Sequence, residues 1–267
     1  MRRVPWFTAL MWVSLALALA FLTLPVLAIF TNTEPGQLVS SLGDQQARDA
    51  LRLSLETSAI AVAVIVLVGT PASFLLATRS FRGKSTLTTL LELPLVLPPA
   101  VAGLGLLAAL GPQGILGGAL ADAHVQLVLQ TSGVVVALVF VASPFYLRQA
   151  QASFAAVDRS YLDASRTLGA GAGATFVRVA IPLALPGIAA GLGLAWARAL
   201  GEFGATLMFA GSFQGITQTT PLAIYGEFPT DFPGALALSA ILVVVSAGVL
   251  LSVKFVSASA LRGVAAR

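Results

Sequence analysis

The sequence predicts an all-α membrane protein with about six transmembrane helices. Its 267 residues are 57% hydrophobic and only 10% charged, whereas soluble domains carry about 25% charged residues. The apolar residues gather in runs, and about 20 helical residues are enough to cross a hydrocarbon core of about 30 Å. Lys and Arg are concentrated in alternate connections between these runs, which is typical of cytoplasmic loops.

Six apolar runs are long enough to be spans of one transmembrane domain over 1–267. A helix satisfies its backbone N–H and C=O groups within the segment, so helices fit these runs better than barrel strands of about 10 residues. The first run follows Met1-Arg2-Arg3 and is longer than a usual signal core. We interpret it as an uncleaved span, with a cleaved signal as the alternative. The expected spans are 7–30, 53–78, 87–110, 126–147, 183–210 and 234–256.

The positive charges predict the orientation. If the spans alternate, Arg48 and Arg52 fall on one side, Arg198 lies inside a span, and the other Lys and Arg residues share the opposite side. Because short cytoplasmic loops accumulate Lys and Arg, we expect both termini in the cytoplasm. The residues on that side are Arg2, Arg3, Arg79, Arg82, Lys84, Arg148, Arg159, Arg166, Arg178, Lys254, Arg262 and Arg267.

Composition also bears on other kinds of partner. A net charge of +4 and a pI near 10.1 would suit nucleic acid only if the basic residues shared one solvated face. They lie between apolar runs instead, so we expect membrane lipid and no nucleic acid as a partner. The chain has no cysteine and one histidine, His124, so we expect no disulfide and no metal site.

The long connection 148–182 predicts a short cytoplasmic helix. Ser160 can cap its start, with Asp163 returning a hydrogen bond, and Gly169 suits a left-handed stop after Leu168. A helix of two or three turns is too short to be stable alone. We therefore expect it to dock on a partner; a helix that packs on its own bundle or on the membrane surface is the alternative.

This connection resembles the EAA signature of ABC importer permeases. That signature reads E-A-A, three residues, G, nine residues, I-x-L-P, and its spacing matches Asp163-Ala164-Ser165, Gly169 and Val179-Ala180-Ile181-Pro182. Asp163 replaces the glutamate and Ser165 the second alanine, and Val179 and Ile181 are conservative departures.

The resemblance implies a coupling helix that sits in a groove of a separate ATP-binding subunit. The chain has no Gly-x-x-x-x-Gly-Lys-[Ser/Thr] loop, so we expect a non-catalytic subunit that binds no cofactor, with ATP and Mg²⁺ on the partner. The family also implies a second copy of the permease, two ATP-binding subunits and an extracytoplasmic binding protein. The residues expected to contact the ATP-binding subunit are Tyr161, Leu162, Asp163, Ala164, Ser165, Leu168, Gly169, Val179, Ile181 and Pro182.

Two stretches are candidates for the translocation pathway or its gate. Pro94, Pro98 and Pro99 predict a bent or broken third span, because proline removes a backbone donor and clashes with the preceding turn; such breaks often line a cavity. In the fifth span Arg198 and Glu202 are four residues apart and can pair. Ordinary packing kinks and an interfacial ion pair are the alternatives. The gate candidates are Pro94, Pro98, Pro99, Glu202, Phe203, Gly204 and Thr206.

Residues 95–99, 103–105, 199–211 and 218–225 resemble molybdate/tungstate permeases. This resemblance implies an oxyanion importer in a prokaryotic cytoplasmic membrane. A sulfate, thiosulfate or phosphate permease is the first alternative. An ion-coupled secondary transporter would show inverted repeats and buried coupling carboxylates, and an intramembrane enzyme would show a converging nucleophile and base; neither pattern is apparent.

Overall fold

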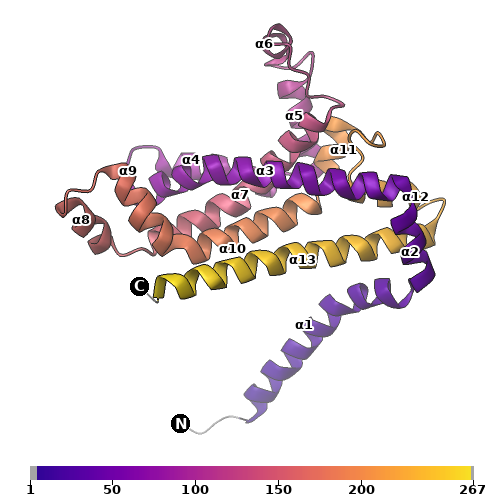
Figure 1. The fold of residues 1–267 in the computed structure, drawn as a ribbon, viewed down its shortest axis with the longest axis horizontal. Helices are drawn as coiled ribbons and strands as arrows, with labels where there is room; N and C mark the ends of the chain where they lie inside the picture. Colours follow the sequence, from indigo (N-terminus) through magenta and orange to yellow (C-terminus); the bar gives the residue numbers. More distant parts are fainter. Residues whose placement is uncertain (1–4, 266–267) are drawn as a thin grey trace.

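The structure is a computed structural model that describes the backbone of residues 5–265 and the side chains of residues 6–38 and 40–255. Within those residues helices joined by loops make up the fold (Figure 1). Five helices are long and apolar enough to cross a membrane, and one sharply bent pair supplies a sixth candidate. The predicted fold class, an all-α polytopic membrane protein, is confirmed.

The long helices are α1 (Pro5–Thr31), α3 (Gln45–Thr78), α7 (Thr131–Ala155), α10 (Ile181–Leu200) and α13 (Phe232–Ala265). The bent pair is α4 (Lys84–Val96) and α5 (Pro99–Leu110). The short helices are α2 (Pro35–Gly43), α6 (Gly117–Asp122), α8 (Arg159–Thr167), α9 (Ala172–Thr175), α11 (Gly204–Ala210) and α12 (Thr220–Glu227). A π-helical turn, η1 (Phe176–Ala180), joins α9 to α10.

Helix α7 is the centre of the bundle and packs between α3 and α10. Lipid tails are as apolar as leucine, so spans associate through close packing of small residues rather than through hydrophobic burial. The core follows this rule: α10 approaches α7 at Gly191, where an added Cβ would lie 3.1 Å from Gln149 Cβ. Fully buried alanines fill much of the remaining contact, among them Ala61, Ala137, Ala142, Ala150, Ala184 and Ala195.

Four expected spans have different limits in the structure. The span expected at 53–78 is α3, which begins earlier, at Gln45, and the span expected at 234–256 is α13, which continues to Ala265. The span expected at 126–147 is α7, which begins at Thr131 and continues to Ala155. Arg148 therefore lies within the helix, where it pairs with Glu92. The span expected at 183–210 is interrupted, since α10 ends at Leu200 and α11 begins at Gly204. A run of apolar residues does not reveal such an interruption.

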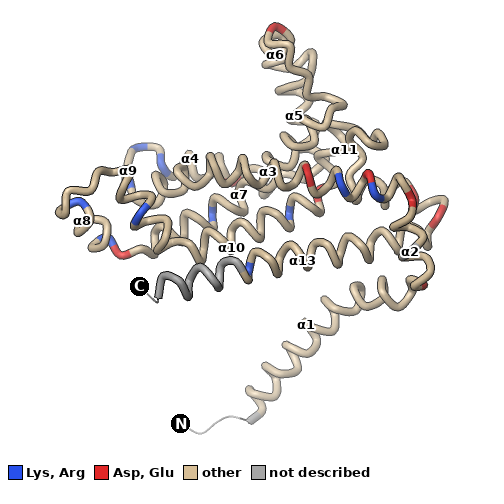
Figure 2. The backbone as a smooth tube through the Cα atoms, in the orientation of Figure 1, with Lys and Arg blue, Asp and Glu red and all other residues tan. Residues whose placement is uncertain are grey.

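The charged residues at one end of the bundle are mostly Lys and Arg, whereas the opposite end carries both basic and acidic residues (Figure 2). One end, called here the α8 end, carries α8, α9 and the start of α4, with Arg79, Arg82 and Lys84 in the α3–α4 turn. The opposite end, called the α12 end, carries α2 and α12 with Arg48 and Arg52. Arg2, Arg3 and Arg267 lie outside the described residues, and the side chain of Arg262 lies outside the described side chains.

Helix α1 contributes nothing to the core. None of its most apolar stretch is buried, and Trp6, Trp12 and Phe21 are all largely exposed. The helix runs away from the bundle and approaches it near α2 and the start of α13 (Figure 1).

Candidate functional site

The start of α8 is capped by Asp158. Asp158 Oδ1 accepts a hydrogen bond from the Ser160 backbone N–H at 2.9 Å. That bond, with a second one from the Ser160 side chain, lowers the pKa of Asp158, because an accepted hydrogen bond favours the ionised carboxylate. The expected cap by Ser160 with Asp163 is therefore wrong. Ser160 already lies inside the helix, and Asp163 instead pairs with Arg166 at 3.3 Å.

The end of α8 is a Schellman motif. Gly169 has φ +84°, a left-handed conformation that costs an L-residue steric strain but is open to glycine. The Ala170 N–H donates to Ser165 O at 3.1 Å and the Gly169 N–H to Arg166 O at 2.9 Å. This sharp stop leaves Leu168, the last residue before the glycine, 88% exposed.

Helix α8 has one face on the bundle and one face away from it. Leu162 is 5% exposed and belongs to the main core cluster, whereas Tyr161 is 57% exposed. Asp163 and Ala164 are also exposed. Ser165 is half-buried, and its hydroxyl lies 3.1 Å from that of Thr175. The helix is thus anchored by one leucine while its other face remains available.

The rest of the EAA-like stretch lies against the core. Val179 and Ile181 are half-buried and pack on the main cluster, and Pro182 is half-buried at the start of α10. The structure therefore separates the predicted coupling residues into an exposed set on α8 and an inward set that joins the loop to α10.

An aromatic cluster that the sequence did not predict links this loop to the spans. The ring of Phe176 in η1 lies 4.8 Å from that of Phe74 in α3 and 6.2 Å from that of Phe154 in α7. Phe74 and Phe154 are themselves 5.3 Å apart, edge to face. Three phenylalanines far apart in the sequence carry no local signal that they meet.

The predicted break in the third span is present. Helices α4 and α5 meet at an angle of 117°, with Pro98 at the N-cap and Pro99 at the first position of α5, where a missing N–H costs nothing. Helix α4 has no buried residue. Its polar link to α7 is the Glu92–Arg148 ion pair at 3.2 Å.

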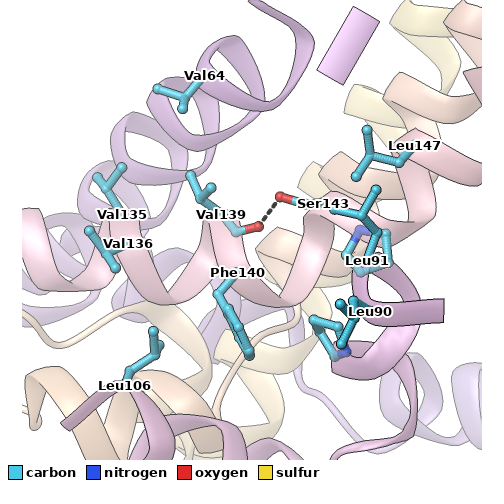
Figure 3. A pocket seen from close by; sticks show the side chains of 12 residues that line it. Val64, Leu90, Leu91, Leu106, Val135, Val136, Val139, Phe140, Ser143 and Leu147 are labelled. Atoms are coloured by element: carbon cyan, nitrogen blue, oxygen red, sulfur yellow. Dashed lines mark hydrogen bonds between the residues drawn. The ribbon is translucent and has the colours of Figure 1, made fainter. Parts of the chain in front are cut away.

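An apolar groove of about 540 Å³ lies beside the bend (Figure 3). Pro94, Leu90 and Leu91 line it from α4, and Phe140 and Leu147 line it from α7. Ser143 also lines the groove, and its hydroxyl donates back to Val139 O. Among the predicted gate residues, Pro94 is therefore the one that borders this groove.

Glu202 occupies the break between α10 and α11 and is 1% exposed. Its Oε1 accepts a hydrogen bond from the Ala205 N–H at 2.7 Å. Its Oε2 lies 2.5 Å from Arg198 Nη2, and the Arg198 side chain is 26% exposed. The predicted pair between residues 198 and 202 is confirmed, and the carboxylate also caps α11.

The structure brings the two predicted gate stretches together. A Cβ added to Gly204 would lie 2.8 Å from Pro99 Cβ, and one added to Gly103 would lie 2.7 Å from Ala205 O. The ring of Phe203 lies 5.0 Å from that of Tyr225. Thr206 is fully buried, and its hydroxyl has no hydrogen-bond partner among the described residues.

The distribution of His, Asp and Glu side chains bears on metal binding. Within the described residues no three His, Asp or Glu side chains lie close enough to hold a metal ion. His124 is exposed in the α6–α7 loop with φ +57°.

Comparison with known proteins agrees with this architecture. The chain is 41% identical over 235 residues to the "Molybdenum transport system permease protein ModB" of Mycobacterium bovis, covering 88% of this chain and 89% of that protein. It is 34% identical over 194 residues to the "Molybdate/tungstate transport system permease protein WtpB" of Pyrococcus abyssi, covering 72% and 73%.

A solved structure shares the fold. It is described as a "bacterial alginate ABC transporter in complex with alginate pentasaccharide-bound periplasmic protein" and matches with a TM-score of 0.76 over 96% of this chain and 95% of that chain. The sequence identity is 15%, so this likeness bears on the fold alone.

The fold and these relatives define the chain as the transmembrane permease subunit of an importer. Residues 69–261 match the family described as "Binding-protein-dependent transport system inner membrane component". The chain belongs to that family and is a multi-pass inner-membrane protein.

Proposed function

We propose that this chain carries molybdate or tungstate across the cytoplasmic membrane, driven by ATP hydrolysis in a separate subunit. The observation that carries the proposal is the 41% identity with a molybdenum permease over 88% of the chain. The aligned region takes in 235 residues and 89% of the relative's length, so the similarity is not confined to one short segment.

In this proposal the exposed face of α8 docks in a groove of the ATP-binding subunit. Tyr161 and Leu168 are large apolar side chains, 57% and 88% exposed, at the end of the bundle where arginines also gather. Two exposed apolar side chains on a short, doubly capped helix suit a protein partner, because buried aromatic and aliphatic anchors dominate protein interfaces.

Force then reaches the spans through the inner face of the same loop. Leu162 packs in the main core, and Phe176 contacts Phe74 and Phe154 on two different spans. Closure of the ATP-binding subunits would thus move α8 together with the ends of α3 and α7, as rigid-body rocking requires.

The remaining parts of the assembly follow from the family. We propose two copies of the permease, two ATP-binding subunits that hold ATP and Mg²⁺, and an extracytoplasmic protein that delivers the anion. The α8 end faces the cytoplasm, and both termini lie on that side. A divalent oxyanion is strongly disfavoured in a low-dielectric core, so the path between the two copies must be polar or hydrated.

Uptake into proteoliposomes tests this function. The permease is reconstituted with its ATP-binding subunit and binding protein, and labelled molybdate is offered outside with ATP inside. We expect uptake that requires ATP and the binding protein, that unlabelled tungstate inhibits, and that a tenfold excess of sulfate leaves intact.

Two results would count against the proposal in different ways. If sulfate inhibits uptake as strongly as tungstate, the substrate is a broader class of oxyanions, and the proposal of an ATP-driven permease still stands. Uptake that persists without ATP but follows an ion gradient would reject ATP coupling itself. A control assembly whose ATP-binding subunit cannot hydrolyse ATP should show no uptake above the leak of empty vesicles.

A further inference from the structure

Glu202 is a carboxylate that is almost completely buried within the protein. It is 1% exposed and lies in the loop between two apolar helices. Burial of an ionised carboxylate is costly unless it is both paired and hydrogen-bonded. Glu202 Oε1 accepts a hydrogen bond from the Ala205 N–H. Oε2 is paired with Arg198 by charge but has no hydrogen-bond partner among the described residues. The two oxygens thus join the last turn of α10 to the first turn of α11.

Each of these contacts fixes a different element. The first backbone N–H groups of α11 have no partner within the helix, and Oε1 satisfies the one at Ala205. Oε2 lies 2.5 Å from Nη2 of Arg198, which is in the last turn of α10. The chain changes direction at Gly201 and Phe203, and the side chain of Glu202 bridges that change.

Helix α11 is in turn seated directly on α5. A glycine lies at each of two contact points, so no side chain separates the two backbones there. Gly204 of α11 faces Pro99 of α5. Gly103 of α5 faces α11, where a Cβ added to this glycine would lie 2.7 Å from Ala205 O and 2.7 Å from Met208 Cβ. Ala102, Leu106, Ala205 and Phe209 complete a shared cluster of buried residues with α7. Helices α5 and α11, called here the α5–α11 pair, therefore pack as one body.

The connection on the other side of α5 is different. Helix α4 has no buried residue, and it meets α5 at 117° across Leu97 and Pro98. Besides its apolar contacts with α7, the described residues of α4 make the partly exposed Glu92–Arg148 pair and an exposed hydrogen bond from Lys84 Nζ to Arg79 O at 3.2 Å. The chain is thus firmly held at the α10–α11 break and loosely held at the α4–α5 bend.

We propose that Glu202 is a positioning residue that fixes the α5–α11 pair to the end of α10. Motion of α10 then carries the pair with it, and the α4–α5 bend absorbs the change. Glu202 touches no substrate in this account; it acts through the orientation of α5 and α11. The transport part of the test rests on the proposed function, whereas the distance part does not.

Distances between spin labels test the positioning directly. The chain has no cysteine, so Leu104→Cys on α5 and Leu194→Cys on α10, both about half exposed, give a unique labelled pair. A second pair, Leu67→Cys on α3 with Leu194→Cys, reports on the bundle itself. Measurements use the full assembly in lipid discs, with labelled permease diluted by unlabelled permease.

Glu202→Gln is the informative variant, because its amide oxygen can still accept from Ala205 N–H while the ion pair with Arg198 is lost. We expect the distribution between labels 104 and 194 to broaden at least twofold and that between 67 and 194 to stay unchanged. Glu56→Gln is the matched control: Arg52–Glu56 is also an Arg–Glu pair four residues apart, but it is exposed, and neither distribution should change.

Transport gives a second readout. Glu202→Gln should raise the number of ATP molecules hydrolysed per anion imported at least threefold, and Glu56→Gln should leave that ratio unchanged. An unchanged 104–194 distribution in Glu202→Gln would overturn the proposal. Broadening of both distributions would overturn it too, since Glu202 would then stabilise the whole bundle. If the wild-type assembly imports no oxyanion, the proposed function fails while the distance result still stands.

Discussion

Helices α8 and α11 meet the same physical requirement in two different settings. Both are short, and both leave unpaired backbone N–H groups at the start that another group must satisfy. Asp158 caps α8 in a solvated position, whereas Glu202 caps α11 from a fully buried one and needs Arg198 to balance its charge. Loss of the buried cap should therefore cost far more than loss of the exposed one.

The two helices also differ in how they contact their neighbours. Helix α8 rests on the bundle through Leu162 and exposes Tyr161 and Leu168, while α11 is packed against α5 through glycine contacts. The first arrangement suits an element that a partner must reach, and the second suits an element that must hold its place within the membrane. Three substitutions test this difference, and a fourth, in α12, shows the effect of a half-buried carboxylate that belongs to neither helix.

Glu202→Ala should produce the largest loss of stability. It leaves Arg198 without its partner and the Ala205 N–H without an acceptor, and removal of one member of a buried pair costs about 3–5 kcal/mol. Unfolding in mixed micelles measures the change in free energy. Glu56→Ala, which breaks an exposed pair, should stay within about 1 kcal/mol of wild type; equal effects of the two variants would remove the distinction between buried and exposed charges.

Gly204→Ala should destabilise the α5–α11 contact. The new methyl group would lie 2.8 Å from Pro99 Cβ and 3.2 Å from Ala100 N, and overpacking of this kind costs about 1–3 kcal/mol. Gly105→Ala is the control on α5, because nothing lies within 4 Å of its added Cβ and alanine favours a helix over glycine. A neutral Gly204→Ala would show that α5 and α11 are free to separate.

Gly169→Ala should cost about 1 kcal/mol, because alanine at φ +84° is strained. The strain should loosen the end of α8. Docking of the ATP-binding subunit should therefore weaken clearly, while the thermal midpoint of the permease falls only slightly. Gly173→Ala, in α9 with open space around it and no positive φ, is the control. Co-purification of the ATP-binding subunit measures docking, and equal recovery with both variants would contradict a role for this stop.

Glu227→Gln should have the smallest effect. Partial burial, followed by the nearby charges of Asp231 and Asp44, raises the pKa of Glu227 above its ordinary 4.5. The protonated form is therefore favoured in the folded state, and the resulting stability is lost as pH rises through the raised pKa. At neutral pH the thermal midpoint of the variant should rise by up to about 1 °C. The midpoint should also change less than that of wild type when the pH is lowered. A midpoint below that of wild type at neutral pH would contradict the expected sign.

Local sequence rules predicted the features that depend on one backbone position. The left-handed conformation of Gly169 and the bend at Pro98 and Pro99 follow from what those residues permit at φ. The Arg198–Glu202 pair follows from helical spacing. The N-cap of α8 was predicted wrongly because Asp158 and Ser160 are both good caps, and propensity alone does not choose between them.

Features that depend on tertiary contact could not be predicted in this way. The residues 199–210 are largely apolar, so hydropathy gives no sign that α10 ends at Leu200. The meeting of Gly204 with Pro99, and of Phe74 with Phe154 and Phe176, joins residues far apart along the chain. A single sequence contains no record of such pairs.

The exposed face of α8 is the surface that we propose binds a separate nucleotide-hydrolysing subunit. A single cysteine at Leu168→Cys, introduced into this cysteine-free chain, allows the most direct test by photo-cross-linking in the assembled complex. We expect a cross-link to the ATP-binding subunit whose yield changes when ATP is added, and none from a matched cysteine at Leu67 on the exposed surface of α3. A label at 168 that reacts only with lipid or with the permease itself, in a complex that hydrolyses ATP, would contradict it.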